Sequence, residues 1–467
     1  MSRSETKEMT SGNPFKLIIG FAVPLLFGML FQQFYSMVDT IIVGKYLGVD
    51  ALAAVGSTGS INFMVIGFCM GVCNGFAIPV AQKFGAGDYK FLRKYAANSV
   101  WLSILFSVVM TFIVCVLCMN ILVWMKTPLD IIDGAYDYIF VIFLGIPATY
   151  LYNLLSAIIR SLGDSKTPLV FLIISSVINI VLDLVFIIVM GMGVSGAAWA
   201  TVIAQGVSGA LCFIYMKKKY KVLKFQDKEE LKLNKECMRN LCYMGVPMGL
   251  QYSITAIGSV ILQTAVNDLG SSVVAAVTAA TKIIIFICCP FDALGSTMAI
   301  YAGQNIGAKK PHRVSEGLKA SIIIGSVYSV AALVVSVLFG KYLSLLFVSR
   351  EQTEIISQVV MYLVINAAFY IPLCLVNTVR FTIQGMGYST FAILAGVCEM
   401  IARGLCGFVF VPIFGYVAVC LASPVAWIFA DAFLIPAYKS VLKKSKEEMG
   451  TTVGKVKLHK MTVLETE

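Results

Sequence analysis

The sequence predicts an all-α polytopic membrane protein with twelve transmembrane helices, arranged as two pseudo-symmetric six-helix lobes (parallel repeats) around a central cleft. Three observations support this prediction. Hydrophobic residues make up 59% of the 467-residue chain and charged residues only 13%, with a mean hydropathy of +0.87. Uncharged apolar runs of about twenty residues, enough to cross a bilayer as a helix, recur along the chain. Motifs of the first half also return in the second half.

The same composition excludes other classes of protein. A soluble protein carries roughly 25% charged residues, so this chain lacks the polar side chains that a water-exposed surface requires. Disordered, collagen-like and coiled-coil chains do not contain 30 Phe and 20 Tyr. The strands of a membrane barrel alternate over about ten residues, whereas these apolar runs are continuous. The spans are therefore predicted to be helices.

Twelve spans follow when about twenty residues are allowed for each and polar or Gly/Pro clusters are used as breaks. The first apolar run extends through Gly44 without an A-x-A cleavage site, which indicates a span and not a signal peptide. The predicted spans are 16–44, 53–81, 95–118, 131–160, 168–190, 194–216, 239–267, 274–303, 317–340, 354–383, 389–411 and 415–437.

The distribution of the 36 Lys and Arg residues shows what the net charge of +11 means. When alternate loops are assigned to opposite sides of a membrane, 29 of these residues fall on one side and four on the other. The four are Lys45, Lys126, Lys341 and Arg350. This asymmetry follows the positive-inside rule, so we predict that both termini are cytoplasmic. The partners are then membrane lipids, with no role for nucleic acid.

The chain is predicted to divide into five parts. They are a cytoplasmic N-terminus (1–15), an N-terminal six-helix lobe (16–216), a cytoplasmic linker (217–238), a C-terminal six-helix lobe (239–438) and a basic cytoplasmic tail (439–467). The basic stretch 217–239 is interpreted as a solvated connector that faces lipid headgroups, in preference to a specific recognition patch.

The two lobes are predicted to be repeats because three features recur at nearly constant spacing. Pro24 matches Pro247, QKFGA at 82–86 matches QNIGA at 304–308, and RSLGDS at 160–165 matches QGMGYS at 384–389. The offsets are 223, 222 and 224 residues. Six spans in each half make the repeats parallel, and such a pair encloses a cleft that can face each side of the membrane in turn.

Several motifs carry a resemblance to a known family. They are FQQFYSMVDTIIVG at 31–44 after Pro24, QKFGAGD at 82–88, RSLGDSKTP at 160–168 and NIVLD at 179–183. Together they resemble the MATE (multidrug and toxic compound extrusion) family, in particular its MepA-type bacterial drug exporters. The resemblance implies a multidrug efflux antiporter of the bacterial plasma (inner) membrane. Such a protein expels organic, often cationic, compounds in exchange for sodium or protons by alternating access, and we expect it to function as a monomer.

Charged residues within the predicted spans are candidate functional groups, because each costs about 2.5 to 3.5 kcal/mol at the bilayer centre unless it faces a cavity or a partner. The residues are Asp39, Asp183, Lys282, Asp292, Arg380, Glu399, Arg403 and Asp431.

Asn179 and Asp183 are four residues apart in the fifth span, so both side chains lie on one helix face. Their oxygens suit a hard monovalent cation, and a desolvated carboxylate can instead carry a proton. Asp39 is predicted to lie in the same outer half of the N-terminal lobe. The resemblance places a sodium or proton coupling site at Asp39, Asn179 and Asp183, with Thr201 as a further ligand. The ligand from the fourth span stays open.

Related transporters often have Asn four residues before the arginine of the fourth span, but this chain has Ser156 there and Asn153 one turn earlier. The alternative for Asn179 and Asp183 is a polar pair that only fixes helix packing. The repeat favours a function, because the counterparts of Asp39, Asn179 and Asp183 are Leu262, Arg403 and Gly407. One lobe therefore folds without acids at these places.

The remaining charges are assigned as structural or cavity charges. Glu399 and Arg403 are four residues apart and are expected to pair within one helix. Lys282 and Asp292 are ten residues apart, too far for one pair, and Lys282 could bridge to a carboxylate across the cleft. Helix bends are expected at Pro24 and Pro247, either for conformational change or as static kinks.

Two other functions compete with antiport. A flippase for a lipid-linked precursor, of the related superfamily, commonly has a cleft rich in Arg and Lys, whereas this N-terminal lobe is acidic. An intramembrane enzyme needs a nucleophile with a base, or a metal cluster. His312 and His459 lie in polar segments, no HExxH or GxSxG motif occurs, and the thirteen cysteines lie mostly in apolar runs. We therefore expect no enzyme, no cofactor and no metal beyond a sodium ion at Asp39, Asn179 and Asp183.

Overall fold

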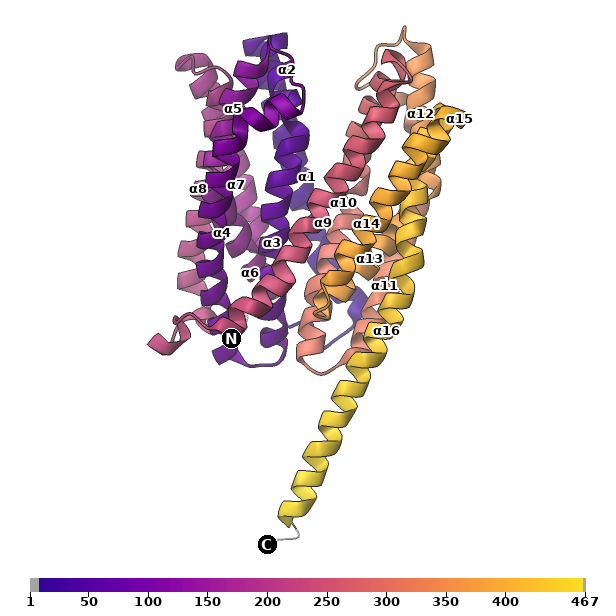
Figure 1. Ribbon diagram of the computed structural model, residues 1–467. Helices are drawn as coiled ribbons and strands as arrows, with labels where there is room; N and C mark the ends of the chain where they lie inside the picture. Colours follow the sequence, from indigo (N-terminus) through magenta and orange to yellow (C-terminus); the bar gives the residue numbers. More distant parts are fainter. Residues whose placement is uncertain (1–7, 465–467) are drawn as a thin grey trace.

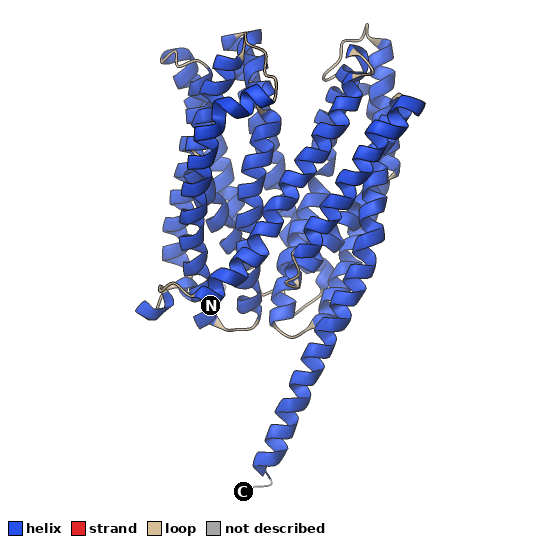
Figure 2. Ribbon diagram, in the orientation of Figure 1, coloured by secondary structure: helices blue, strands red, loops and turns tan. Residues whose placement is uncertain are grey.

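The computed structural model describes residues 8–464, and all regular secondary structure in this range is helical (Figure 2). The N-terminal half contains α1 (Pro14–Leu47), α2 (Val49–Ser57), α3 (Gly59–Gly85), α4 (Tyr89–Trp124), α5 (Ile132–Leu144), α6 (Ile146–Ser161), α7 (Lys166–Leu184), the π-helical turn η1 (Val185–Val189) and α8 (Val194–Lys219). The linker carries the short turns η2 (Lys221–Leu223) and η3 (Lys228–Glu230). The C-terminal half contains α9 (Lys235–Asn267), α10 (Ser271–Gly307), α11 (Pro311–Ser344), α12 (Thr353–Ala368), α13 (Tyr370–Gly385), α14 (Thr390–Leu405), the π-helical turn η4 (Cys406–Phe410), α15 (Val411–Phe414) and α16 (Tyr416–Leu464).

The number of spans agrees with the prediction. Within the described residues, ten helices are long and apolar enough to cross a membrane, and two pairs of shorter helices qualify when each pair is counted as one span. The total is then twelve, six in each half. The predicted fold class is therefore confirmed.

The fourth and tenth spans are each broken into two helices, which their continuous apolar sequences did not predict. The axes of α5 and α6 differ by 47°, and those of α12 and α13 by 52°. Pro147 and Pro372 lie just after the two breaks, where each removes a backbone N–H that a continuous helix would need. In contrast, the predicted bend residues Pro24 and Pro247 lie within the unbroken helices α1 and α9.

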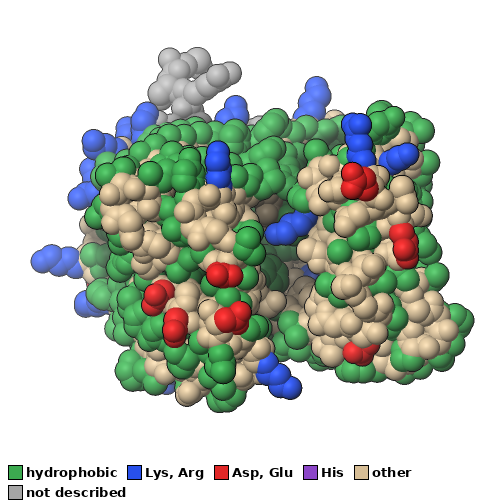
Figure 3. All heavy atoms as spheres, turned by 90° about the horizontal axis from the view of Figure 1, so that it is seen from above, with side chains coloured by type: hydrophobic (Ala, Val, Ile, Leu, Met, Phe, Trp, Pro, Cys, Tyr) green, Lys and Arg blue, Asp and Glu red, His purple; other side chains and the backbone are tan. Residues whose placement is uncertain are grey.

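The two halves form lobes that lie side by side (Figure 1). Both described chain ends lie at the same end of the molecule, which we call the closed end because the lobes are in contact there. At the opposite end, here called the open end, the lobes diverge and a hollow separates them (Figure 3). The repeated architecture includes the broken spans and the turns η1 and η4, which follow α7 and α14 respectively.

The first helix of each lobe crosses to the other lobe at the closed end. Ile18 and Phe21 of α1 are buried in the hydrophobic core of the C-terminal lobe, whereas Cys237 and Leu241 of α9 are buried in that of the N-terminal lobe. Helices α3 and α9 can pack closely because glycines of α3 face the backbone of α9. A Cβ atom at Gly75 would lie 2.5 Å from the Cα atom of Gly245.

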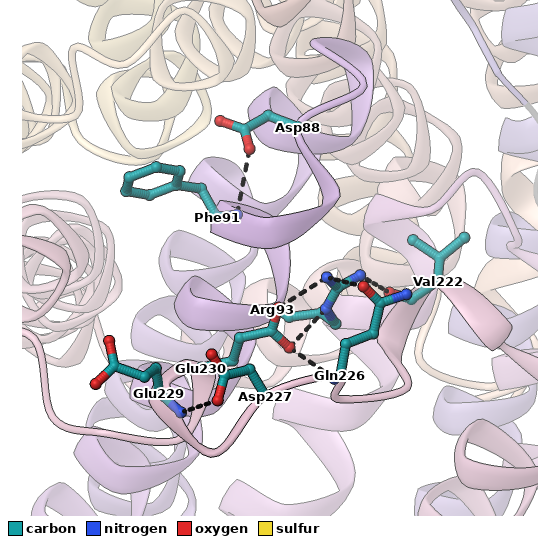
Figure 4. Close-up of polar contacts among 8 residues, drawn as sticks. All are labelled: Asp88, Phe91, Arg93, Val222, Gln226, Asp227, Glu229 and Glu230. Carbon is teal, nitrogen blue, oxygen red and sulfur yellow. Dashed lines mark hydrogen bonds and ion pairs between the residues drawn. The ribbon is translucent and has the colours of Figure 1, made fainter.

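The linker is anchored on the N-terminal lobe by a few polar contacts (Figure 4), while most of its side chains are exposed, as expected of a solvated connector. Arg93 of α4 donates to both carboxylate oxygens of Glu230, at 2.8 and 2.7 Å, and both side chains are buried. The backbone N–H of Asn234 donates to Oδ1 of Asn98 at 2.9 Å. The hydrogen bonds from Arg93 lower the pKa of Glu230 to about 2.

Candidate functional site

The predicted acids are buried in the N-terminal lobe. Ser175, Asn179 and Asp183 follow one another at intervals of four residues on α7, and all three are buried. Val177 and Val181, on the opposite face of α7, are more than half exposed and suit lipid contact. The polar face of α7 is therefore turned into the lobe, and Asp39 of α1 joins it there.

The carboxyl groups of Asp39 and Asp183 lie beside each other and receive no hydrogen bond from any other described residue. Oδ1 of Asp39, Oδ1 of Asn179 and both carboxylate oxygens of Asp183 are buried without a partner. Nδ2 of Asn179 donates to Oγ1 of Thr201 at 3.3 Å, so its amide oxygen is the atom left without a partner. Four unpaired oxygens in one buried region form a donor set that suits a small cation or a proton.

Three further residues border this region and were not predicted from the sequence. Tyr138 of α5 is buried within electrostatic range of both carboxyl groups, and Tyr35 lies one helical turn before Asp39. Oε1 of Gln205 on α8 is also buried without a partner. Gln205 is four residues after Thr201, so the i,i+4 spacing that identified Asn179 and Asp183 could have identified it as well.

Neither candidate ligand of the fourth span bonds the acids: Asn153 lines the cavity between the lobes that is described below, and Ser156 is buried beside Arg160. Nδ2 of Asn153 donates to the carbonyl of Thr149 at 2.8 Å. Oγ of Ser156 accepts a hydrogen bond from Arg160 at 2.9 Å. No hydrogen bond joins Asn153 or Ser156 to Asp39 or Asp183 among the described residues.

The charged residues of the C-terminal lobe form a separate cluster. Glu399 accepts a hydrogen bond from Arg403 at 3.3 Å, which is the pair expected within one helix. Glu399 also accepts a hydrogen bond from Arg380 of α13. Asp431 is buried, and its Oδ1 has no partner. Asp292 lies within electrostatic range of Arg380, while Lys282 is exposed and no ion pair between it and a described carboxylate is present. The predicted bridge from Lys282 across the cleft is therefore absent in this conformation.

A cavity of about 170 Å³ lies between the lobes. Residues of α1, α3, α6, α7 and α8 line its N-terminal side, and residues of α9, α10 and α13 line the other side. Its lining is mostly apolar and includes Met29, Met70 and Met248. Flexible thioether side chains adapt to ligands of different shape.

The repeated loop motifs join the two lobes at the closed end. Nε2 of Gln82 donates to the carbonyl of Gly385 at 3.0 Å, and Nε2 of Gln304 donates to the carbonyl of Ser161 at 2.9 Å. The two bonds are related by the repeat, because Gln82 corresponds to Gln304 and Ser161 to Gly385. We call this set of reciprocal contacts the closed-end gate.

Two glycines permit the close approach of the two lobes at these contacts. A Cβ atom at Gly85 would lie 1.9 Å from the carbonyl oxygen of Gln304, and one at Gly307 would lie 1.8 Å from that of Gln82. Both distances are far shorter than any real contact of a Cβ atom. Only glycine therefore permits this approach of the two backbones.

Twelve spans in two parallel repeats, with a cavity between the lobes and unpaired carboxyl groups in one lobe, define a membrane transporter. Comparison with known proteins identifies the family. The MatE family model matches residues 24–185 and 247–409, one segment in each lobe and together more than half of the chain. The chain belongs to the MATE family of multidrug transporters.

Individual relatives agree with this assignment. YoeA of Bacillus subtilis, a probable multidrug resistance protein, is 30% identical over 339 residues, which cover 71% of this chain and 73% of that protein. The multidrug export protein MepA of Staphylococcus haemolyticus is 22% identical, with 82% of this chain and 84% of that protein covered. The fold matches an outward-facing multidrug resistance MATE transporter of the MOP superfamily, with a TM-score of 0.86, 22% identity, and 94% of this chain and 98% of that chain covered.

Proposed function

We propose that this protein is an antiporter that exports organic compounds, cationic ones among them, in exchange for sodium or protons by alternating access. The observation that carries the proposal is the group of four unpaired oxygens at Asp39, Asn179 and Asp183. Buried polar atoms are rarely left without a partner, so a group of them in a transporter lobe is a site for the coupling ion. Sodium and protons both match an all-oxygen site with two carboxyl groups.

We further propose that the closed end faces the cytoplasm of a bacterium and that the protein lies in the plasma (inner) membrane. The loops at the closed end carry most of the Lys and Arg residues of the chain, as the positive-inside rule requires of cytoplasmic loops. The conformation described here then has its cavity open to the outside. Alternating access requires the closed-end gate to open and the open end to close.

The names of the relatives support export of drug-like molecules. YoeA and MepA are described as a probable multidrug resistance protein and a multidrug export protein respectively. The apolar, methionine-containing cavity suits substrates of varied shape. No enzymatic step is part of this proposal.

The experiment that tests the proposal is dye transport in everted vesicles, with a sodium gradient and a proton gradient imposed separately. A lipophilic cationic fluorescent dye serves as the probe. We expect transport with one of the two gradients in the wild type and none in Asp183→Asn, which preserves the side-chain shape but removes the ionisable group. Asp130→Asn, an exposed acid at the start of the α5 segment, is the matched control and should transport normally. Normal gradient-driven transport by a well-expressed Asp183→Asn variant would overturn the coupling role.

A further inference from the structure

The linker between the lobes exposes apolar side chains at the closed end. Leu231 and Leu233 are 44% and 64% exposed, although both belong to a polar segment of the chain. Trp101 of α4 is 48% exposed, and its Nε1 donates to the carbonyl of Leu231 at 3.2 Å. We call these three residues the apolar edge. Burial of exposed apolar area is favourable, so the apolar edge indicates contact with lipid or with a partner.

The apolar edge continues the lipid-facing surface of α4. Trp101, Leu105 and Val108 follow one another at helical spacing, and each is about half exposed. Trp101 lies six residues inside the predicted span 95–118. Its hydrogen bond therefore places Leu231 at the border of the membrane, where tryptophan is enriched in membrane proteins. Lipid is the occupant that this position favours.

Specific contacts hold the linker at this depth. Asn98 of α4 is fully buried, its Oδ1 accepts from the N–H of Asn234 at 2.9 Å, and its Nδ2 donates to the carbonyl of Lys232 at 3.4 Å. The buried pair of Arg93 and Glu230 holds the preceding turn (Figure 4). Backbone polar groups close to lipid need such partners, because the bilayer interior has no water to bond them. The contacts therefore fix the position of the apolar edge.

The repeat shows that these contacts serve the linker, because the C-terminal lobe folds without them. The three anchoring residues of α4 have an arginine, an amide and an indole side chain, and none of these groups occurs at the equivalent positions of α11. At the offset of 222 residues that relates QKFGA to QNIGA, the counterparts of Arg93, Asn98 and Trp101 are Ser315, Ala320 and Ile323.

Lysine side chains surround the apolar edge. Lys90, Lys94 and Lys232 lie within electrostatic range of the Glu229 carboxylate, which accepts from Lys232 at 2.8 Å. We call these three lysines the basic rim. Over residues 89–94 of α4 and 224–236 of the linker and α9, lysines outnumber the acids that Arg93 does not bond. They are Lys90, Lys94, Lys224, Lys228, Lys232 and Lys235 against Asp227, Glu229 and Glu236.

We propose that this part of the linker is a membrane-docking surface, in which the apolar edge enters the headgroup region of the bilayer and the basic rim binds anionic phospholipids. One occupant suits both parts, because an anionic phospholipid presents a phosphate beside apolar chains. Lysine can extend its methylene groups along such a surface and place its ammonium group among the phosphates. Insertion and selectivity for negative charge go beyond a connector that only faces headgroups. The surface fixes the N-terminal lobe to lipid directly before α9 begins at Lys235.

The first measurement tests whether the linker contacts lipid. Cysteine in place of Leu233, in the full-length protein without its native cysteines, carries a bimane label, and the protein is placed in nanodiscs of phosphatidylcholine that is brominated on its acyl chains. Bromine quenches the label on contact. We expect at least about threefold stronger quenching at Leu233 than at Lys446, as insertion of apolar side chains implies.

Two reference positions set the scale of this measurement. Lys446 is an exposed residue of the basic tail after the last predicted span, and Val108 lies on the lipid-facing surface of α4. Quenching at Leu233 should exceed about half of that at Val108. Quenching no stronger than at Lys446 would overturn the proposal, because a surface that serves a soluble partner stays in water in the purified protein.

The second measurement tests headgroup selectivity. Brominated phosphatidylglycerol and brominated phosphatidylcholine are compared at the same low mole fraction in unlabelled phosphatidylcholine. We expect phosphatidylglycerol to quench the label at Leu233 at least about twofold more strongly. Replacement of all three lysines of the basic rim by Gln should abolish this difference. The matched control should retain it, and it carries Gln at three exposed lysines of the open end, Lys45, Lys126 and Lys341.

Equal quenching by the two lipids, or a preference that survives in the basic-rim variant, would overturn the proposal. A third measurement keeps the native cysteines. Native mass spectrometry of the purified protein, mixed with equal amounts of phosphatidylglycerol and phosphatidylcholine, should show at least about twofold more bound phosphatidylglycerol for the wild type than for the basic-rim variant. Equal amounts would also overturn the proposal. None of these measurements involves an ion gradient or a substrate, so a failure of antiport leaves their outcome unchanged.

Discussion

Alanine at Gly85 and Gly307 should prevent the closed-end gate from closing. The added methyl groups would lie 1.9 and 1.8 Å from carbonyl oxygens of the facing lobe, where contacts of less than 3.0 Å do not occur. The lobes must therefore separate by more than 1 Å at this point. Overpacking of this kind costs about 1–3 kcal/mol per site, so the double variant should disfavour closure by about 2–6 kcal/mol. This corresponds to a shift of at least about thirtyfold in the gate equilibrium.

The higher helix propensity of alanine is too small an effect to cancel this shift in the gate equilibrium. Alanine is favoured over glycine in a helix by about 1 kcal/mol or less, and it stabilises α3 and α10 in the open and the closed gate alike. Gly404→Ala is the matched control, because that glycine lies within α14 and a Cβ atom there would meet nothing within 4 Å. We expect this control to be neutral or slightly stabilising.

The assay measures the distance between two spin labels placed on opposite lobes at the closed end. Cysteines that replace Lys90 and Lys309, in a background without the native cysteines, would carry labels at two exposed positions beside the gate. The double variant Gly85→Ala, Gly307→Ala should show longer distances than the wild type and little dye transport, while Gly404→Ala should match the wild type in both measurements. Short distances together with normal transport in the double variant would refute the reasoning.

Three other predictions concern the ion site, the membrane topology and the linker. Raising sodium or lowering pH, whichever ion is coupled, should weaken equilibrium dye binding to the wild type, and Asp183→Asn should flatten this dependence; wild-type affinity independent of both ions would contradict antiport through this site. Cysteine at Asp227 should be protected from an impermeant thiol reagent in intact cells, while cysteine at Glu351 should react, and labelling at Asp227 would reverse the assigned orientation. Arg93 lowers the pKa of Glu230 to about 2, below its ordinary value of 4.5, so the linker's attachment should be intact above pH 4.5 and weaken as pH falls toward 2. Glu230→Gln should mimic this weakening at neutral pH through faster tryptic cleavage at Lys232, and unchanged cleavage would contradict it.

The number of spans could be predicted from the sequence because the relevant signals are local. The hydropathy of an apolar run by itself indicates whether that run partitions into lipid. The side of the membrane on which Lys and Arg lie depends only on the order of the spans. The bends between α5 and α6 and between α12 and α13 were not predicted, because Pro147 and Pro372 stand within apolar runs that have the length of single spans. Pro24 and Pro247 stand out in the sequence through their repetition, which marks the two helices as equivalent.

The candidate site was predictable in part for a similar reason. Asn179 and Asp183 are related by helical periodicity, and Asp39 is an acid inside a span, so each is visible in one helix. The surroundings of Arg160 could not be predicted in this way, because they depend on the three-dimensional structure. In the sequence it counts as one of the basic residues of a loop, and only the structure places it beside the cavity with Ser156 and Asn74 as neutral partners.

Helix α1 connects the candidate ion site with the closed end. Asp39 lies in its second half, beside Asp183, while Ile18 and Phe21 in its first half are buried in the core of the C-terminal lobe. The segment before α1 continues this contact, because the backbone N–H of Met9 donates to Oε1 of Gln304 at 2.8 Å. Gln304 is also a donor of the closed-end gate. A change of charge at Asp39 would therefore act on a helix whose other end contacts the gate, and the proposed ion binding would have a continuous physical route to the closed end.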